Sequence, residues 1–482
     1  MGNYAMKRLV ILLFGLLSMG LCSAQALYSD GFDPPLIKPL FPAAGGTFQL
    51  PMGPTANQVQ WLMGELAASE TTSIAEINAH FDPSSLVSTT AAQWKAFIDS
   101  LRGTFPNAVI REVVMLTPVR ATLVIASPGA PPPYGYVNVG AKYTGSQLIT
   151  LFGASNYGGS VQYPSDQTLT LTQAADKFAT LSTSPGLFVG RINSAGACSE
   201  IIGRNATPPR ATASIFKLWI LGGLGRAIAQ GAVSSNDLVP MVASEIALGG
   251  TINSEPLNTP FSVRDLARLM IGISDNTATD LLHELLGRML LNQVVMDYGV
   301  SQPDLMTPLL GISEQFHLFF SFNLSTALSY VNGTQAFKNQ FLQNNVVPLG
   351  PNNGGSFSNS SLLTDGSWRA SATDVCRAFG QMLRLPQGSE AIMTVDAAAG
   401  AGVAQPEVRN KWQRVWYKGG SLASGTNNFH VLTHAWMLQN AGKDPYVVVA
   451  MSNSANGNID QFNVQSVTGR LLQLVYDMSL AP

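Results

Sequence analysis

The stretch Pro209-Arg210-Ala211-Thr212-Ala213-Ser214-Ile215-Phe216-Lys217 decides how this chain is interpreted. It holds the only Ser-x-x-Lys pattern in the 482 residues, and the apolar run from Ile215 to Ala227 predicts a buried helix. Residues i and i+3 share a helix face, so Lys217 can reach the hydroxyl of Ser214. A hydroxyl needs a base beside it to act as a nucleophile, and a lysine becomes that base when desolvation or nearby cations lower its pKa. The stretch therefore predicts a nucleophile and its base.

Two further motifs follow in order along the chain. Ser274-Asp275-Asn276 is the only Ser-Asp-Asn and begins 60 positions after Ser214, and Lys418-Gly419-Gly420-Ser421 follows the strand-like Val415-Trp416-Tyr417. Alone, a Ser-Asp-Asn usually marks a turn or a helix N-cap, and a Lys-Gly-Gly usually marks the end of a hairpin. The order, spacing and context of the three motifs together predict a serine acyl-transfer site.

The three motifs resemble those of the class A β-lactamase and penicillin-binding protein superfamily, S-x-x-K, S-D-N and K-T-G. The surroundings of the second motif, residues 261–266 and 273–282, resemble the family as well. The third motif departs from the pattern, with Gly419 where threonine is usual. The resemblance implies an α+β fold, in which a five-stranded antiparallel sheet packs with helices and a helical lobe holds the first two motifs. The active site is expected between the sheet and the lobe.

The resemblance implies catalytic roles for five side chains: Ser214, Lys217, Ser274, Asn276 and Lys418. Ser214 attacks a carbonyl carbon to form an acyl-enzyme, and Ser274 relays a proton to the leaving group. Asn276 binds the amide side chain of the substrate, and Lys418 attracts a substrate carboxylate and favours a neutral Lys217. The backbone N–H groups of Ser214 and Ser421 form the oxyanion hole beside Gly420. The expected substrate is a small acyl compound (a β-lactam, an ester or a peptide), with no cofactor and no metal.

Deacylation is where the chain departs most from the class A enzymes, which place a water-activating glutamate after the second motif. Residues 305–316 contain one carboxylate, Glu314, outside the family's E-x-x-L-N pattern. Glu314 is a weak candidate for that base, and the alternative is a helix cap. Without a base we expect a slowly hydrolysed acyl-enzyme, which also favours a transpeptidase or carboxypeptidase. A non-catalytic ligand-binding protein on the same scaffold is the third hypothesis.

The chain divides into four predicted segments. Residues 1–26 resemble a secretory signal peptide, with Lys7 and Arg8 before an apolar stretch, and residues 27–53 form a Pro- and Gly-rich linker. Residues 54–165 have helical patterns followed by strand-like runs and form an α+β accessory domain. This domain resembles the nuclear transport factor 2/ketosteroid isomerase-like (NTF2-like) domain that precedes the β-lactamase-like domain in clavulanic-acid-cluster proteins. Residues 169–482 form the hydrolase domain.

Periodicity places the elements within the two domains. In the accessory domain, helices are expected over 58–68, 74–80 and 91–101, and strands over 108–116, 121–126 and 134–139. In the hydrolase domain, strands are expected over 187–192, 199–204, 430–437 and 446–451, between helices over 169–181 and 464–478. An insertion rich in Asn, Gly and Ser occupies 321–367, and we expect 352–361 to be a surface loop or a flap over the substrate.

Composition excludes several classes of protein. A net charge of −2 with 12% charged residues lacks the basic surface that nucleic acid or anionic membranes require. The apolar stretch from Leu9 to Cys22 is too short to span a bilayer, so we expect export, to the periplasm or outside the cell. There Cys198 and Cys376 can pair or remain two buried thiols, and the sequence leaves both open. The five histidines are scattered, which argues against a metal site.

Overall fold

The computed structural model describes residues 53–352, 354–355 and 360–480. The predicted signal peptide and nearly all of the predicted linker lie outside the described residues, and so does the middle of the predicted loop at 352–361.

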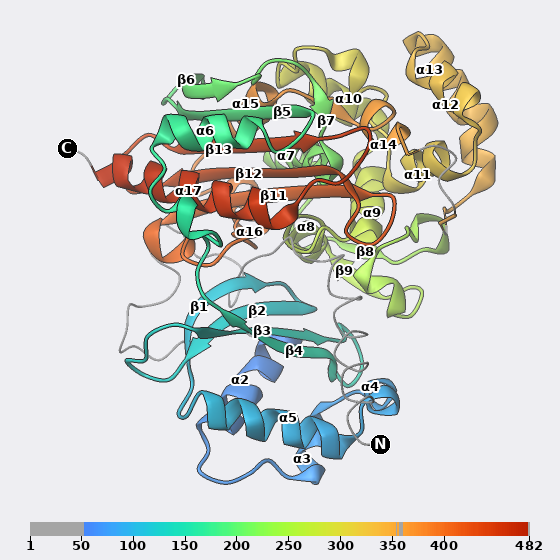
Figure 1. The fold of residues 1–482 in the computed structure, drawn as a ribbon. Coiled ribbons are helices and arrows are strands. Elements are labelled where there is room, and N and C mark those ends of the chain that lie inside the picture. Colours follow the sequence, from blue (N-terminus) through green and yellow to red (C-terminus); the bar gives the residue numbers. More distant parts are fainter. Residues whose placement is uncertain (1–52, 353, 356–359, 481–482) are drawn as a thin grey trace.

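The N-terminal unit places four helices before a four-stranded antiparallel sheet in the order β1-β2-β3-β4. The predicted helices and strands of this region are confirmed in position, whereas α4 and β4 were not predicted. The helices lie on the face of the sheet that points away from the rest of the chain (Figure 1). The elements are α2 (Pro54–Ala67), α3 (Ile74–His80), α4 (Pro83–Ser88), α5 (Ala91–Thr104), β1 (Val109–Leu116), β2 (Arg120–Ala126), β3 (Tyr134–Ala141) and β4 (Ile149–Tyr157).

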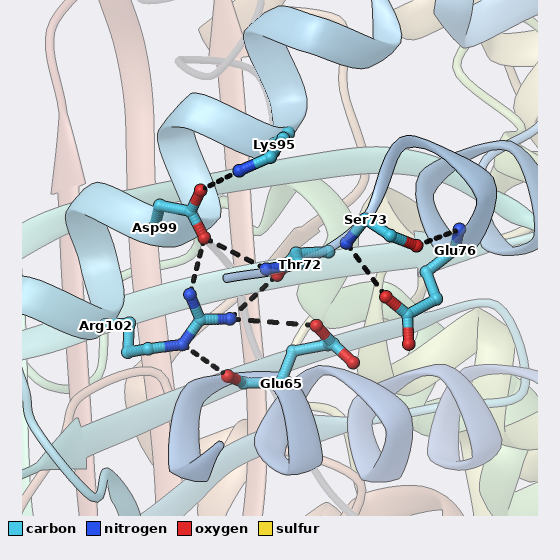
Figure 2. Close-up of polar contacts among 7 residues, drawn as sticks. All are labelled: Glu65, Thr72, Ser73, Glu76, Lys95, Asp99 and Arg102. Carbon is cyan, nitrogen blue, oxygen red and sulfur yellow. Dashed lines mark hydrogen bonds and ion pairs between the residues drawn. The ribbon is translucent and has the colours of Figure 1, made fainter. Parts of the chain in front are cut away.

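A polar cluster ties these helices together (Figure 2). Asp99 of α5 forms ion pairs of 2.5 Å with Lys95 and Arg102 and accepts the backbone N–H of Thr72. Arg102 also donates to the backbone carbonyl of Glu65 at the end of α2. Asp99 is thus bound by two cations and a backbone N–H, and the cluster fixes the packing of the helices.

The second unit is built on a five-stranded antiparallel sheet in the order β11-β12-β13-β5-β6. Alternate residues of a strand point to opposite faces, and β13 illustrates this. Val447 and Val449 join the core with the helical lobe, whereas Val448 and Ala450 pack toward α6 and α17, which lie together on the other face (Figure 1). The predicted strands and end helices are confirmed. They are α6 (Leu171–Ala179), β5 (Ser184–Ile192), β6 (Cys198–Arg204), β11 (Arg414–Ala423), β12 (Phe429–Gln439), β13 (Tyr446–Asn453) and α17 (Gln461–Leu480).

The helical lobe covers the opposite face of this sheet. Its helices are α7 (Lys217–Ala229), α8 (Val263–Gly272), α9 (Asn276–Leu286), α10 (Arg288–Asp297), α11 (Ile312–Phe320), α12 (Leu324–Val331), α13 (Gln335–Phe341), α14 (Leu362–Asp365), α15 (Ala372–Leu383) and α16 (Glu390–Ala399). Two short strand pairs, β7 (Arg210–Ala211) with β10 (Arg369–Ala370) and β8 (Leu238–Pro240) with β9 (Pro260–Ser262), complete it. The region 321–367 contains helices α12, α13 and α14, so describing it only as an Asn-, Gly- and Ser-rich insertion missed its structure.

The two units share a buried interface. Val114 and Val124 of the N-terminal sheet belong to the same core cluster as Val403 and Trp412 of the second unit. The carboxylate of Glu112 in β1 accepts the backbone N–H groups of residues 407 and 409 across the interface. The N-terminal sheet is therefore covered on both faces, by its own helices and by the second unit.

A disulfide joins Cys198 of β6 to Cys376 of α15, with their Cα atoms 6.3 Å apart. It links the edge strand of the sheet to the helical lobe. The two cysteines, which the sequence left open as paired or as separate thiols, are therefore paired. None of the helices in the described part of the chain has the length and apolar character needed to cross a membrane.

Candidate active site

Ser214 lies on a tight turn between the sheet and the helical lobe. Residues Ala213–Phe216 form a 3₁₀ turn that leads directly into α7, which begins at Lys217. A 3₁₀ turn has three residues per turn, so Ser214 and Lys217 point to the same side. Ala213, immediately before the nucleophile, is buried and has a φ of 44°, a backbone conformation that is costly for alanine. The surrounding packing has to maintain this conformation.

Side chains from distant segments hold the turn in place. The hydroxyl of Thr433 in β12 donates to the carbonyls of Thr212 (2.8 Å) and Gly420 (3.1 Å). Trp368 accepts the backbone N–H of Thr212 at 2.9 Å, and its ring stacks on Phe216 at a centroid distance of 3.9 Å. Neither Thr433 nor Trp368 was predicted as a site residue. No signal in the sequence identifies them, because their roles depend on strands and loops far away in the chain.

Lys217 joins the first two motifs. Its side chain is fully buried, and Nζ lies 2.7 Å from the backbone carbonyl of Ser274, 3.2 Å from Ser274 Oγ and 2.8 Å from Asn276 Oδ1. Burial lowers the pKa of Lys217 well below its ordinary value, and the charge of Lys418 lowers that pKa further, against the opposing effect of Asp275. A neutral Lys217 can accept the proton of a neighbouring hydroxyl.

The Ser-Asp-Asn motif forms a strained turn between α8 and α9. Ser274 has a φ of 59°, in the left-handed region. The buried carboxylate of Asp275 accepts the backbone N–H of Ala278 (2.8 Å), which caps α9, and those of Thr251 (2.6 Å) and Ile252 (3.0 Å). Asp275 therefore fixes the turn on both sides, and this explains an acidic residue at the centre of the motif.

Asn276, which is expected to bind the substrate amide, is held by contacts within the protein. Its Oδ1 accepts a hydrogen bond from Lys217, and its Nδ2 donates to the carbonyl of Leu248 at 2.6 Å. Both polar atoms of the side chain are thus engaged within the protein. The Nδ2 amide of Asn276 carries two N–H groups, so one can bind a substrate carbonyl while Leu248 accepts the other.

The third motif enters from strand β11. Lys418 is fully buried and donates to the carbonyl of Gly419 at 2.7 Å. A Cβ atom at Gly420 would lie 2.6 Å from the backbone nitrogen of Ser214, so only glycine allows this strand to approach the nucleophile so closely. Ser421, the next residue, is exposed. The structure thus brings β11 against the backbone of Ser214.

Two carboxylates, Glu314 and Asp280 of α9, hold the start of helix α11. Glu314 accepts the N–H of Gly311 at 3.0 Å in a capping box at the start of α11 and pairs with Arg288. These contacts favour the helix-cap interpretation of Glu314 over the role of a deacylation base. Asp280 accepts the N–H groups of Ile312 (2.6 Å) and Ser313 (2.9 Å), and burial raises its pKa to about 7. Asp280 therefore anchors the start of the same helix.

Among the residues that the structure describes, no three His, Cys, Asp or Glu side chains gather in a way that could hold a metal ion.

Comparisons with known proteins show which family part of the chain is similar to. The sequence model of the family described as "Beta-lactamase enzyme family" matches residues 174–339, which hold the first two motifs and end before Lys418. This match supports a function of the serine hydrolase type. No curated protein is similar enough to match.

The matches to solved structures cover about two thirds of this chain. A β-lactamase from Chitinophaga pinensis is 13% identical over 64% of this chain and 99% of its own, with a TM-score of 0.43. A β-lactamase from Sphaerobacter thermophilus is 17% identical over 65% of this chain and 97% of its own, with a TM-score of 0.42. A structure of PBP-A is 18% identical over 64% of this chain and 97% of its own, with a TM-score of 0.41. Identities this low say nothing about substrate.

Proposed function

We propose that this protein is a serine hydrolase that forms an acyl-enzyme on Ser214 with a β-lactam, an ester or an activated amide. One observation carries the proposal. The buried Lys217, whose pKa is lowered, lies one turn after Ser214 and contacts both Ser274 Oγ and Asn276. These contacts support a base and a proton relay one helical turn from the nucleophile.

The residues suggest the following steps. Neutral Lys217 takes the proton of Ser214, and Ser214 Oγ attacks the carbonyl carbon of the substrate. The N–H groups of Ser214 and Ser421 stabilise the oxyanion, a contribution worth about 2.7–4 kcal/mol per donor. Ser274 passes the proton from Lys217 to the leaving nitrogen or oxygen as its bond to carbon breaks. Ser214 is then an ester, and a water must attack that ester to release the product.

The last step is the slow one in this proposal. Within residues 303–370 the sequence has three carboxylates, Asp304, Glu314 and Asp365. Glu314 serves the cap of α11, Asp304 accepts from Gln335, and Asp365 is exposed. This favours a long-lived acyl-enzyme, and it keeps a cell-wall transpeptidase or carboxypeptidase as the second candidate.

Mass spectrometry of the protein after incubation with benzylpenicillin and nitrocefin tests the proposal, with Ser214→Ala as the control. A lasting adduct on Ser214 that Ser214→Ala lacks would support acylation with slow deacylation. Rapid nitrocefin turnover without an adduct would support acylation and contradict the slow step. Release of D-alanine from a cell-wall peptide would support the second candidate. Absence of any adduct or turnover with these compounds and with fluorophosphonates would refute the proposal.

Two further parts of the proposal concern the ends of the chain. The basic and apolar pattern of residues 1–26 supports export as a secreted, periplasmic protein. The helices-then-sheet order of residues 54–157 supports an NTF2-like accessory domain, as in clavulanic-acid-cluster proteins. N-terminal sequencing of the exported protein would test the first, because cleavage after Ala26 predicts a chain that begins at Leu27.

A further inference from the structure

We propose that the β1–β2 turn of the N-terminal unit, residues 117–120, is a positioning element of the acyl-transfer site. Thr117 and Arg120 support the Ser-Asp-Asn turn, residues 272–276, in the conformation that holds Lys217. The inference rests on the proposed function, and it assigns to the N-terminal unit a direct influence on acylation.

The β1–β2 turn reaches across the interface into the helical lobe. Val119, at its tip, is 4% exposed and belongs to the core cluster that contains Met270 and Ile271 of α8. Thr117 is 1% exposed. A Cβ atom at Gly272 would lie 2.7 Å from Thr117 Cγ2, so the methyl group of Thr117 rests on the last residue of α8. Ser274 follows two residues later.

The β1–β2 turn is rigid enough to act as a support. The backbone N–H of Thr117 donates to the carbonyl of Arg120 at 2.7 Å, and the N–H of Arg120 donates back to Thr117 Oγ1 at 3.1 Å. The hydroxyl of Thr55, at the start of α2, donates to the carbonyl of Pro118 at 2.8 Å. Displacing the turn would therefore require breaking several buried hydrogen bonds.

Arg120 adds a buried cationic group to the turn. Its Nε is buried and has no hydrogen-bond partner among the described residues. Burial lowers the pKa of Arg120, and the negative charge of Asp275 opposes that lowering. Asp275 stands between Ser274 and Asn276, which both contact Lys217. Replacing the Arg120 side chain would disturb the β1–β2 turn, whose Thr117 rests on Gly272, and the Ser-Asp-Asn turn would relax.

The consequence is a dependence of the reaction on the N-terminal unit. A displacement of about 1 Å at a catalytic group can lower a rate by as much as a hundredfold, so the support of a strained turn matters for acylation. Ser274, with its φ of 59°, is such a strained residue.

The matched control lies in the same interface. Glu112 also crosses between the units, but it binds the backbone of residues 407 and 409, which carry none of the three motifs. Glu112→Gln weakens the interface without touching the β1–β2 turn. If the interface only held the two units together, Glu112→Gln and the Arg120 variants would lower the acylation rate equally.

The experiment measures the rate constant for acylation of Ser214 in the full chain with a fluorescent penicillin or a fluorophosphonate. Gly272→Ala should lower this rate about tenfold, because the added methyl would lie 2.7 Å from Thr117 Cγ2 and 3.0 Å from Ala401 Cβ. Thr117→Ser removes the colliding Cγ2 and keeps the hydroxyl, so it should restore part of the rate in the double variant. Arg120→Met should lower the rate by a similar factor and Arg120→Lys by less, whereas Glu112→Gln should lower thermal stability and leave the rate unchanged.

Two outcomes would overturn the inference. In the first, Thr117→Ser restores none of the acylation rate that Gly272→Ala loses, and the two effects simply add in the double variant. In the second, Glu112→Gln lowers the acylation rate as much as Arg120→Met does. If the wild-type chain acylates with neither reagent, the proposed function fails, and amide hydrogen exchange of residues 269–278 then decides the inference. Faster exchange there in Arg120→Met than in Glu112→Gln would support it, and equal exchange in the two variants would refute it.

Discussion

Replacing Gly420 by alanine tests the close approach of strand β11 to the nucleophile. A Cβ atom at this position would lie 2.6 Å from Ser214 N, 2.7 Å from the carbonyl of Thr212 and 2.8 Å from Thr433 Oγ1. Ordinary contacts begin near 3.4 Å, so the strand and the turn must separate by about 0.8 Å. Two of the three obstructing atoms belong to the backbone, which cannot turn aside as a flexible side chain does.

The expected result is a large loss of acylation with a moderate loss of stability. Overpacking of this kind costs about 1–3 kcal/mol of unfolding free energy, and a misplacement near 1 Å lowers a rate by about a hundredfold. The acylation rate constant and a urea unfolding curve measure the two effects separately. Gly425→Ala is the matched control, since a Cβ there meets no atom within 4 Å. A Gly420→Ala variant that acylates at the wild-type rate would refute an oxyanion hole shared between β11 and the Ser214 turn.

Three further changes have defined outcomes. Lys418→Gln should raise the pKa of Lys217, because it removes a cation that lowers this pKa. The acidic limb of the pH profile of acylation should then move to higher pH. A limb that does not move would contradict this prediction. Replacing Cys198 and Cys376 by serine opens a loop closed over 178 positions and should lower the free energy of unfolding by about 2–5 kcal/mol in urea; an unchanged midpoint would exclude a stabilising disulfide. Burial raises the pKa of Asp280 to about 7 from 3.8, so the folded protein keeps a proton that the unfolded chain has lost, and stability falls as pH rises from about 4 to 7. Asp280→Asn should reduce this loss of stability, measured as the difference between the urea midpoints at pH 5 and pH 7. An equal difference in the variant and the wild type would contradict the prediction.

Strong periodicity made most of the sheet and the end helices predictable. The run at 446–451 is apolar or aromatic at every position, which is typical of a strand buried on both faces, and β13 occupies it. The motif spacing was equally informative, because the structure brings Lys217 into contact with both Ser274 and Asn276.

Features that depend on long-range contacts were not predictable. The sequence shows two cysteines, but only the fold brings their Cα atoms to 6.3 Å. Thr433 and Trp368 hold the nucleophile turn through a strand pair and a ring stack, and their local sequence gives no sign of this. For α12 and α13 the signals were present, since Asn323 and Thr334 cap these helices, but the many Asn, Gly and Ser residues around them obscured the pattern.

The shared interface between the two units limits how the protein can be dissected. Removal of residues 54–157 would uncover the side chains that Val114 and Val124 now cover, including Trp412, and would leave the end of α8 without its neighbour Thr117. An exposed apolar patch of this kind favours aggregation. An inactive or insoluble fragment that begins at α6 would therefore say nothing about the chemistry of Ser214. Point variants in the intact chain separate the contribution of one unit from that of the other.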